Sequence, residues 1–251
     1  MAVSLAVQRR TERITIMSTD AQDGAQHSLS SFADPKAVAR YSEVPRRFVP
    51  GFDALHLMTG ILLAERAPSD ATVLVLGAGG GLELKAMAEA YPSWRFVGVD
   101  PSEEMLKLAA RTLGPLVERV ELVQGHIEDA PAGPFDAATC LLTLHFLGAD
   151  ARQRTAHDIR RRLKPGAPFV AAHGSFPQGR DERALWLSRY AAYATASGAD
   201  AEQVSKARTA VDASVNMLSP EQDEAILHAA GFSDMRLFYA AFTWRGWIAY
   251  A

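Results

Sequence analysis

The fold is decided by residues 73–83, which read VLVLGAGGGLE: an aliphatic run, a glycine-rich turn and the start of an amphipathic segment. The aliphatic run predicts a buried strand over 72–76, and the apolar spacing that follows predicts a helix over 82–91, closed by Pro92. Because the glycines carry no side chain, a ligand can approach the backbone and the start of the helix. We therefore predict a strand, a binding turn and a helix in direct succession.

The alternation of apolar runs and helical stretches continues along the chain, which predicts an α/β fold with a doubly wound sheet covered by helices. Two further helical stretches, 181–197 and 201–213, fall outside this alternation and predict a helical cap insert. A hairpin is predicted over 232–250. The other expected strands are 95–99, 119–124, 135–144 and 167–173.

The composition excludes several classes of protein. With 48% hydrophobic and 22% charged residues, the 251-residue chain falls in the range of globular proteins. The 26 Lys and Arg against 29 Asp and Glu give a formal net charge of -3, which disfavours nucleic acid as a partner. No apolar run approaches the roughly 18 residues that span a bilayer, so we expect no membrane partner. The single cysteine, Cys140, cannot form an intrachain disulfide, which favours a cytoplasmic protein.

The expected elements divide the chain into a tail and one domain. Residues 1–31 combine an Arg-bearing start with a polar segment, which predicts a flexible N-terminal tail. Residues 32–251 are expected to form a single domain, with a helical cover over 32–69 and the cap insert over 177–218. The oligomeric state is left open, with a homodimer as one option.

The spacing of the glycines narrows the choice of ligand. A dinucleotide-binding turn that began at Gly77 would need a small third residue where this chain has Leu82, so NAD and FAD are disfavoured. Asp100 follows the second expected strand, from which a carboxylate can reach the hydroxyls of a ribose bound across the turn. The alternative is that the glycines only form a tight turn and Asp100 caps the next helix.

Four motifs in this order resemble the class I S-adenosylmethionine-dependent methyltransferases: GAGGG at 77–81, VDPS at 99–102, GHIED at 125–129 and LTLHFL at 142–147. The KPG at 164–166 and the terminal hairpin are similar too. The resemblance implies a Rossmann-like methyltransferase sheet of strand order 3-2-1-4-5-7-6, with strand 7 antiparallel. It also implies S-adenosyl-L-methionine as the cofactor.

The resemblance assigns roles to residues at the carboxyl ends of the strands. It implies that the glycine turn accommodates the methionine part of the cofactor and that Asp100 binds the ribose. It also implies that His126 and Ile127 contact the adenine, and that aromatic rings ahead of the sheet favour the sulfonium. The cofactor-binding residues expected on this basis are Gly77, Ala78, Gly79, Gly81, Glu83, Asp100, Pro101, Met105, His126, Ile127, Leu141, Leu142 and Phe52.

The chain departs from the methyltransferase pattern at two positions. Methyltransferases usually carry an acidic residue two positions before the first glycine, where this chain has Val75. Glu83, just past the turn, could replace that carboxylate; the alternative is a solvated glutamate that favours the helix dipole. His126 stands where many methyltransferases have an aspartate that contacts adenine, and Ile127 would still pack against the ring.

The flanking segments resemble one branch of this family, the carboxy-S-adenosylmethionine synthases of tRNA wobble-uridine modification. The likeness rests on VPRRFVPGF at 44–52 and SKAR at 205–208. In that branch a tyrosine stands in place of Phe52, an asparagine falls at Leu141, and an arginine matching Arg208 pairs with the extra carboxylate of the ligand. Two of these three polar contacts are missing here, which argues against the synthase reaction.

Methyl transfer needs positioning more than a dedicated base, because the leaving thioether is already a good leaving group. For a hydroxyl or amine acceptor, a histidine would help to remove the proton. His145 and His173 stand at or near the ends of expected strands, and His145 is the better candidate; either could instead pack there without chemistry. No His/Cys/Asp cluster has metal-ligand spacing, so no metal is expected.

We therefore predict an S-adenosylmethionine-dependent methyltransferase that acts on a small-molecule acceptor. His145 is the candidate catalytic residue, and Arg208 is a candidate contact for the acceptor or for a carboxylate. The first alternative is a carboxy-S-adenosylmethionine synthase-like enzyme. The second is a catalytically silent S-adenosylmethionine-binding protein, suggested by Val75 and His126. The acceptor and the atom methylated are left open.

Overall fold

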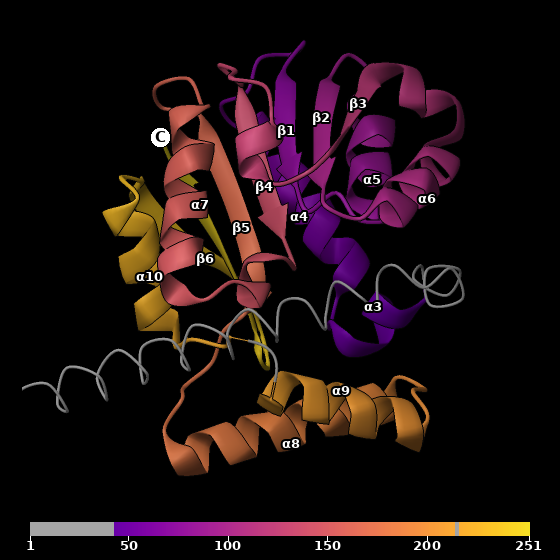
Figure 1. Cartoon of the computed structure of the whole chain (residues 1–251), viewed down its shortest axis with the longest axis vertical. Helices are drawn as coiled ribbons and strands as arrows, with labels where there is room; N and C mark the ends of the chain where they lie inside the picture. The colour runs from indigo at the N-terminus through magenta and orange to yellow at the C-terminus, as the bar shows by residue number, and fades with distance from the viewer. Residues whose placement is uncertain (1–42, 214–215) are drawn as a thin grey trace, which may run out of the picture.

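The computed structural model describes residues 43–213 and 216–251, which form a sheet of order β3-β2-β1-β4-β5-β7-β6 (Figure 1). Strands β1 to β5 run parallel, and β7 is antiparallel to both β5 and β6. This confirms the expected strand order. The predicted tail, 1–31, lies outside the described residues. The strands are β1 (Thr72–Leu76), β2 (Arg95–Asp100), β3 (Val120–Gln124), β4 (Ala137–Leu141), β5 (Pro168–Gly174), β6 (Ser233–Ala241) and β7 (Trp244–Tyr250).

The helices begin where the sequence supplies capping groups. Ser102 and Ser219 each accept a hydrogen bond from the backbone N–H three residues later, at the starts of α6 and α10. No helix among the described residues is both long and apolar enough to cross a membrane. The helices are α3 (Val44–Phe48), α4 (Phe52–Ala64), α5 (Leu82–Ala90), α6 (Glu103–Leu113), η1 (Gly114–Arg119), η2 (Ile127–Asp129), η3 (Leu144–Phe146), α7 (Ala149–Arg161), α8 (Arg180–Ala196), α9 (Ala201–Ala213) and α10 (Pro220–Ala229).

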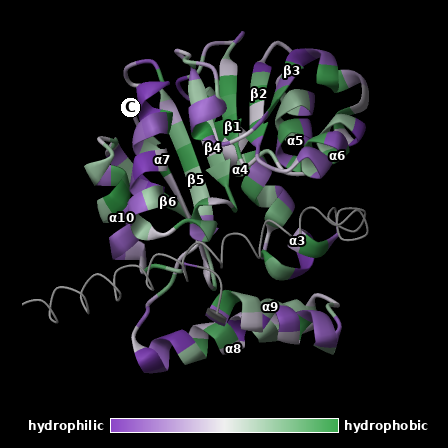
Figure 2. Ribbon diagram, viewed as in Figure 1, coloured by the Kyte–Doolittle hydropathy of each residue, from purple (hydrophilic) through white to green (hydrophobic). Residues whose placement is uncertain are grey.

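The sheet separates two apolar layers. On one face, Leu55 of α4 and Leu84 of α5 belong to the same buried cluster as Val75 of β1. On the other face, Ile159 of α7 clusters with Leu74, the neighbour of Val75 in the strand. Strands buried on both faces are apolar almost throughout, which is why β1, β4 and β5 are predominantly green in Figure 2.

Strand β4 is shorter than the predicted 135–144 and spans Ala137–Leu141. Leu142 leaves the strand with a φ of +53°, although its N–H still donates to the carbonyl of Ala172 in β5. The apolar run continues past the strand because Leu144, in η3, is buried in the same layer as Ile159. Burial of the segment after the strand therefore imitated a longer strand in the sequence.

The helices α8 and α9 form a separate layer next to the carboxyl ends of β4 and β5 (Figure 1). The chain leaves and re-enters the sheet domain at one place, since Ser175 and Leu218 form an isolated parallel bridge. The cap also meets the N-terminal cover, where the rings of Phe48 in α3 and Tyr190 in α8 lie 5.6 Å apart. The cap and the cover therefore lie over the carboxyl ends of the strands, where the glycine turn is found.

Candidate functional site

The glycine turn joins β1 to α5 through a backbone that only glycine tolerates easily. Gly77, Gly79 and Gly81 have φ angles of +78°, +50° and +80°. A Cβ at Gly77 would overlap the Thr143 hydroxyl, and one at Gly81 would lie 2.8 Å from the Cα of Ala109. Gly77 and Gly81 are thus required both by the backbone conformation and by the close approach of neighbours, and Gly79 by its backbone conformation.

Asp100 ends β2 and turns its carboxylate toward the glycine turn. Its Oδ2 accepts the N–H of Gly79 at 2.8 Å, and its Oδ1 accepts the N–H of Ser102 at 2.9 Å. Burial raises the pKa of Asp100 above its usual value, partly opposed by these amides and by His126. Ser102, not Asp100, is the N-cap residue of α6, and Asp100 contacts the start of the helix only through the N–H of Ser102. Each carboxylate oxygen keeps a lone pair for a ligand hydroxyl.

The end of β3 lies beside Asp100, since the N–H of Gly125 donates to the Asp100 carbonyl at 3.0 Å. Asp129 folds back over Gly125 and accepts the N–H of His126 at 2.9 Å. Ile127 is buried, whereas His126 is exposed. This segment therefore presents an apolar side chain and an imidazole next to the carboxylate.

The end of β4 closes the glycine turn from the other side. Thr143 rests on Gly77 and donates from its hydroxyl to the Leu141 carbonyl at 2.9 Å. Leu142 has a positive φ, which a leucine rarely adopts and which tends to occur where function constrains the backbone. Leu141 is buried in the layer that contains Val75. The structure thus brings Thr143 against the glycine turn, directly after the expected cofactor-binding residues Leu141 and Leu142.

Glu83 lies in the first turn of α5 and is only 6% exposed. The solvated alternative for this side chain is therefore wrong. Burial raises the pKa of Glu83 to about 7, and the neighbouring Thr139 hydroxyl opposes this in part. Ala78 and Met105 are also buried at this edge, and Pro101 is half-buried.

Comparisons with known proteins agree with this arrangement. A family described as a methyltransferase domain matches residues 73–166. The carboxy-S-adenosyl-L-methionine synthase of Chromohalobacter salexigens is 28% identical, over 86% of this chain and 82% of that protein. The synthase of Shewanella woodyi is 24% identical, over 90% of this chain and 95% of that protein.

Solved structures share the fold. An O-methyltransferase family protein from Burkholderia thailandensis gives a TM-score of 0.65 at 18% identity, over 88% of this chain and 61% of that one. PigF with SAH gives 0.62 at 20% identity, over 88% of this chain and 60% of that one. The chain is an enzyme of the class I S-adenosylmethionine-dependent methyltransferase type.

In this methyltransferase, His145 lies in η3 and is 5% exposed, with its ring 5.6 Å from the ring of Trp244. Its Nδ1 accepts the N–H of Gly174 at 3.4 Å. Burial lowers the pKa of His145 well below its usual value, and His173 and Arg152 add to this. With Nδ1 accepting, the neutral ring carries its proton on Nε2, so it can donate from that nitrogen.

A buried ionic cluster on the other face of the sheet was missed by the sequence reasoning. Arg152 of α7 pairs with Asp223 of α10, and His173 Nε2 lies 3.2 Å from Asp223 Oδ1. Arg152 also donates to the carbonyls of Leu147 and Asn216, at 3.2 and 2.6 Å. The available signal was the position of Arg152, four and seven residues before the buried Ala156 and Ile159 on the apolar face of α7, but its partner is distant in sequence.

The two candidate residues from the flanking segments, Phe52 and Arg208, lie in different environments. Phe52 is buried with Val75, and its ring lies 4.4 Å from the ring of His56. The guanidinium of Arg46 lies 5.5 Å from the Phe52 ring and 2.8 Å from the Asp53 carboxylate. By contrast, Arg208 is exposed on α9. The structure therefore brings Phe52 to the layer beneath the turn and leaves Arg208 in solvent.

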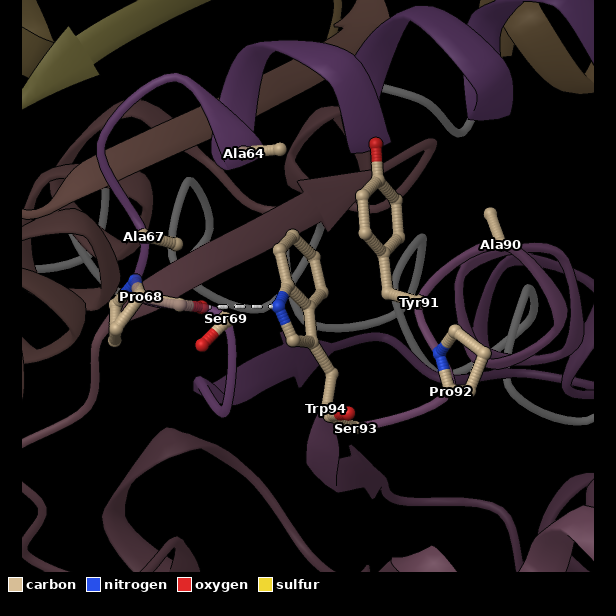
Figure 3. Close-up of a pocket in the computed structure, with 9 residues that line it drawn as sticks. All are labelled: Ala64, Ala67, Pro68, Ser69, Ala90, Tyr91, Pro92, Ser93 and Trp94. Atoms are coloured by element: carbon tan, nitrogen blue, oxygen red, sulfur yellow. Dashed lines mark hydrogen bonds between the residues drawn. The ribbon is translucent and has the colours of Figure 1, made fainter.

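A cavity of about 370 Å³ lies away from this site (Figure 3). Its lining includes residues just before β1 and β2, at the amino ends of the strands. There Trp94 Nε1 donates to the Pro68 carbonyl at 3.1 Å, and Tyr91 stacks on Trp94 at 4.0 Å. In this fold ligands bind at the carboxyl ends of the strands, so the candidate site is the one beside the glycine turn and not this cavity. Among the described residues, no group of three His, Cys, Asp or Glu could hold a metal ion.

Proposed function

We propose that the protein transfers a methyl group from S-adenosyl-L-methionine to a small-molecule acceptor. The observation that carries this proposal is the buried Asp100 carboxylate, held against Gly79 with lone pairs left over. The residues fit the cofactor on structural grounds, because the positive-φ glycines leave no side chain between the carboxylate and the start of α5. The cofactor would supply an electrophilic methyl group on a sulfonium.

The chain's residues would bind and orient. Asp100 would accept hydrogen bonds from two ribose hydroxyls, and the backbone of the glycine turn would line the amino-acid tail. Ile127 would pack against the base, with His126 at its edge. Leu141 and Leu142 would form an apolar floor near the sulfur. Such orientation can supply most of the acceleration of an in-line displacement.

Three buried aromatic residues between the cover, the cap and β7 would form the side of the site that receives the acceptor. Phe48, Tyr190 and Trp244 are all buried, and the Trp244 indole N–H donates to the Phe48 carbonyl at 2.9 Å. These residues would exclude water from the transfer. His145, at the edge of Trp244, would orient an acceptor oxygen through the proton on Nε2. We propose no role for Arg208 in holding the cofactor.

Calorimetry with S-adenosylhomocysteine tests the proposal. We expect the wild-type protein to bind it, and Asp100→Ala to weaken binding by about 1–3 kcal/mol, because a charged acceptor of two hydroxyls is lost. Glu103→Gln, an exposed change on the same helix α6, is the matched control and should bind like the wild type. Absence of binding by the wild type at millimolar ligand would overturn the proposal.

A carboxy-S-adenosylmethionine synthase-like reaction is the second candidate, favoured by the relatives that match most of the chain. Phe52 and Leu141 are buried among apolar side chains, and Arg208 is exposed. These environments offer little to a second carboxylate. Mass spectrometry of ligand released by denaturation separates the two: the synthase reaction requires a carboxylated sulfonium and consumption of prephenate.

We propose a cytoplasmic protein, because its one cysteine, Cys140, is free and buried. We propose a small molecule as its only substrate partner, because the formal net charge of -3 offers no general attraction for nucleic acid.

A further inference from the structure

One buried carboxylate beside the glycine turn has no counter-charge among the described residues. Glu83 is 6% exposed, and its Oε1 has no hydrogen-bond partner among the described residues. No cation contributes to the pKa of this group; the causes are burial and the hydroxyl of Thr139. The Thr139 Oγ1 likewise lacks a partner that meets hydrogen-bond geometry. Two polar groups therefore face each other in an apolar layer with hydrogen-bonding capacity unused.

The strand register places these groups beside the turn. Val75 and Thr139 are paired neighbours in β1 and β4, and Val75 lies on the face covered by α4 and α5. Glu83 follows Gly81 by two residues and points inward with Leu84. The Glu83 carboxyl therefore lies on the face of β1 and β4 that carries Val75 and Thr139, two residues after the last glycine of the turn.

An unpaired carboxylate is energetically unfavourable at this buried position. Burial of an unpaired charge costs several kcal/mol unless the group is neutralised or meets a cation. A leucine or glutamine would cost less, and the raised pKa of Glu83 reflects that cost. The cationic end of a ligand would relieve it. The positive end of the α5 dipole and the N–H groups of the turn are already available for the ligand's carboxylate.

We propose that Glu83 binds the primary ammonium of an amino-acid-bearing nucleoside held in the glycine turn, with Thr139 supporting its carboxylate. The inference rests on the proposed function. It assigns to α5 the negative charge that β1 lacks at Val75. It also makes Glu83 the residue that distinguishes S-adenosylmethionine and S-adenosylhomocysteine from nucleosides without an ammonium group.

Calorimetry with two ligands and three proteins tests this. The ligands are S-adenosylhomocysteine and 5′-methylthioadenosine, which has the nucleoside and sulfur but no amino-acid tail. For Glu83→Gln, we expect a loss of about 10-fold to 100-fold in affinity for S-adenosylhomocysteine, as for a charge-assisted hydrogen bond, and less than about 3-fold for methylthioadenosine. Glu89→Gln, which breaks an exposed pair with Lys85 on the same helix, should change neither.

A second measurement uses S-adenosylhomocysteine alone. At pH 7 about half of the free Glu83 is protonated, and pairing with an ammonium favours the charged form, so binding should release about half a proton. Among the described residues, the other titratable group that interacts with Glu83 is Cys140, whose pKa is raised by burial and by Glu83, so the thiol stays protonated. Binding enthalpies in buffers of different ionisation enthalpy report this release, and Glu83→Gln should abolish it.

The outcomes separate the two proposals. If the wild type binds neither ligand, the proposed function fails. If the wild type binds S-adenosylhomocysteine but Glu83→Gln binds it equally well, the role of Glu83 fails alone. Equal losses for both ligands, or unchanged proton release in the variant, would also overturn it, because the effect would then be structural.

Discussion

Two carboxylates are buried on opposite faces of the same sheet, and the chain treats them differently. Asp223, 1% exposed, meets Arg152 and His173, whereas Glu83, 6% exposed, meets no cation among the described residues. Burial opposes the charge of Asp223, but His173, Arg152 and Ser175 outweigh it and lower its pKa. The pKa of Glu83 is raised to about 7. A carboxylate neutralised from within holds the fold together, and one left without a cation is suited to a ligand.

The carboxyl groups of Asp223 and Glu83 make the free energy of unfolding depend on pH in opposite directions. For Asp223, the lowered pKa means that its stabilising contribution is present above the ordinary pKa and is lost as the pH falls through the folded value. For Glu83, the raised pKa means that the contribution is present below the ordinary value of 4.5 and is lost as the pH rises through about 7. Ligand binding should offset the loss of stability from Glu83 at higher pH and leave the loss from Asp223 at low pH unchanged.

The largest expected effect comes from removing the internal cation. Arg152→Met should lower the free energy of unfolding by about 3–5 kcal/mol, because Asp223 is then buried without its permanently charged partner. Arg161→Met, on the exposed end of the same helix, breaks only a 3.5 Å surface pair with Asp158 and should cost less than about 0.5 kcal/mol. Urea unfolding of both variants makes the comparison. Similar losses in the two would remove the distinction between the carboxylates.

The second-largest expected effect is an increase in the free energy of unfolding. Glu83→Gln should raise the free energy of unfolding of the ligand-free protein by about 2–3 kcal/mol at pH 8, since a buried charge becomes neutral. At pH 5, where Glu83 is already protonated, the variant and the wild type should differ little. Denaturant unfolding at the two pH values gives the result. A variant that is less stable at pH 8 would show that the carboxylate stabilises the empty site.

The smallest effect is expected at a cation that meets neither carboxylate. Arg208 is exposed on α9, so Arg208→Ala should change the affinity for S-adenosylhomocysteine by less than about 0.5 kcal/mol and leave its proton release unchanged. Calorimetry at pH 7 measures both. A large loss would mean that α9 closes over the site when ligand binds, and that Glu83 shares its ligand with an arginine.

The sheet and the glycine turn were predictable from sequence because their signals are local. The aliphatic run before Gly77 and Asp100 at the next strand end locate the carboxyl ends of the strands, whereas the strand order followed from the resemblance to the methyltransferase family. The length of β4 was not predictable, because Leu144 is buried by α7 rather than by strand neighbours. Likewise, no local pattern shows that Glu83 points inward or that Arg152 meets Asp223, since both depend on packing between distant elements.

The single junction of the cap has a consequence for how this enzyme could diversify. Outgoing Ser175 and returning Leu218 are bridged to each other, and Arg152 holds the neighbouring carbonyl of Asn216. A cap of different length or sequence could therefore stand between Ser175 and Leu218 while the parallel strands keep their register. New acceptors could be recruited by exchanging one module, with the nucleoside-binding half inherited intact.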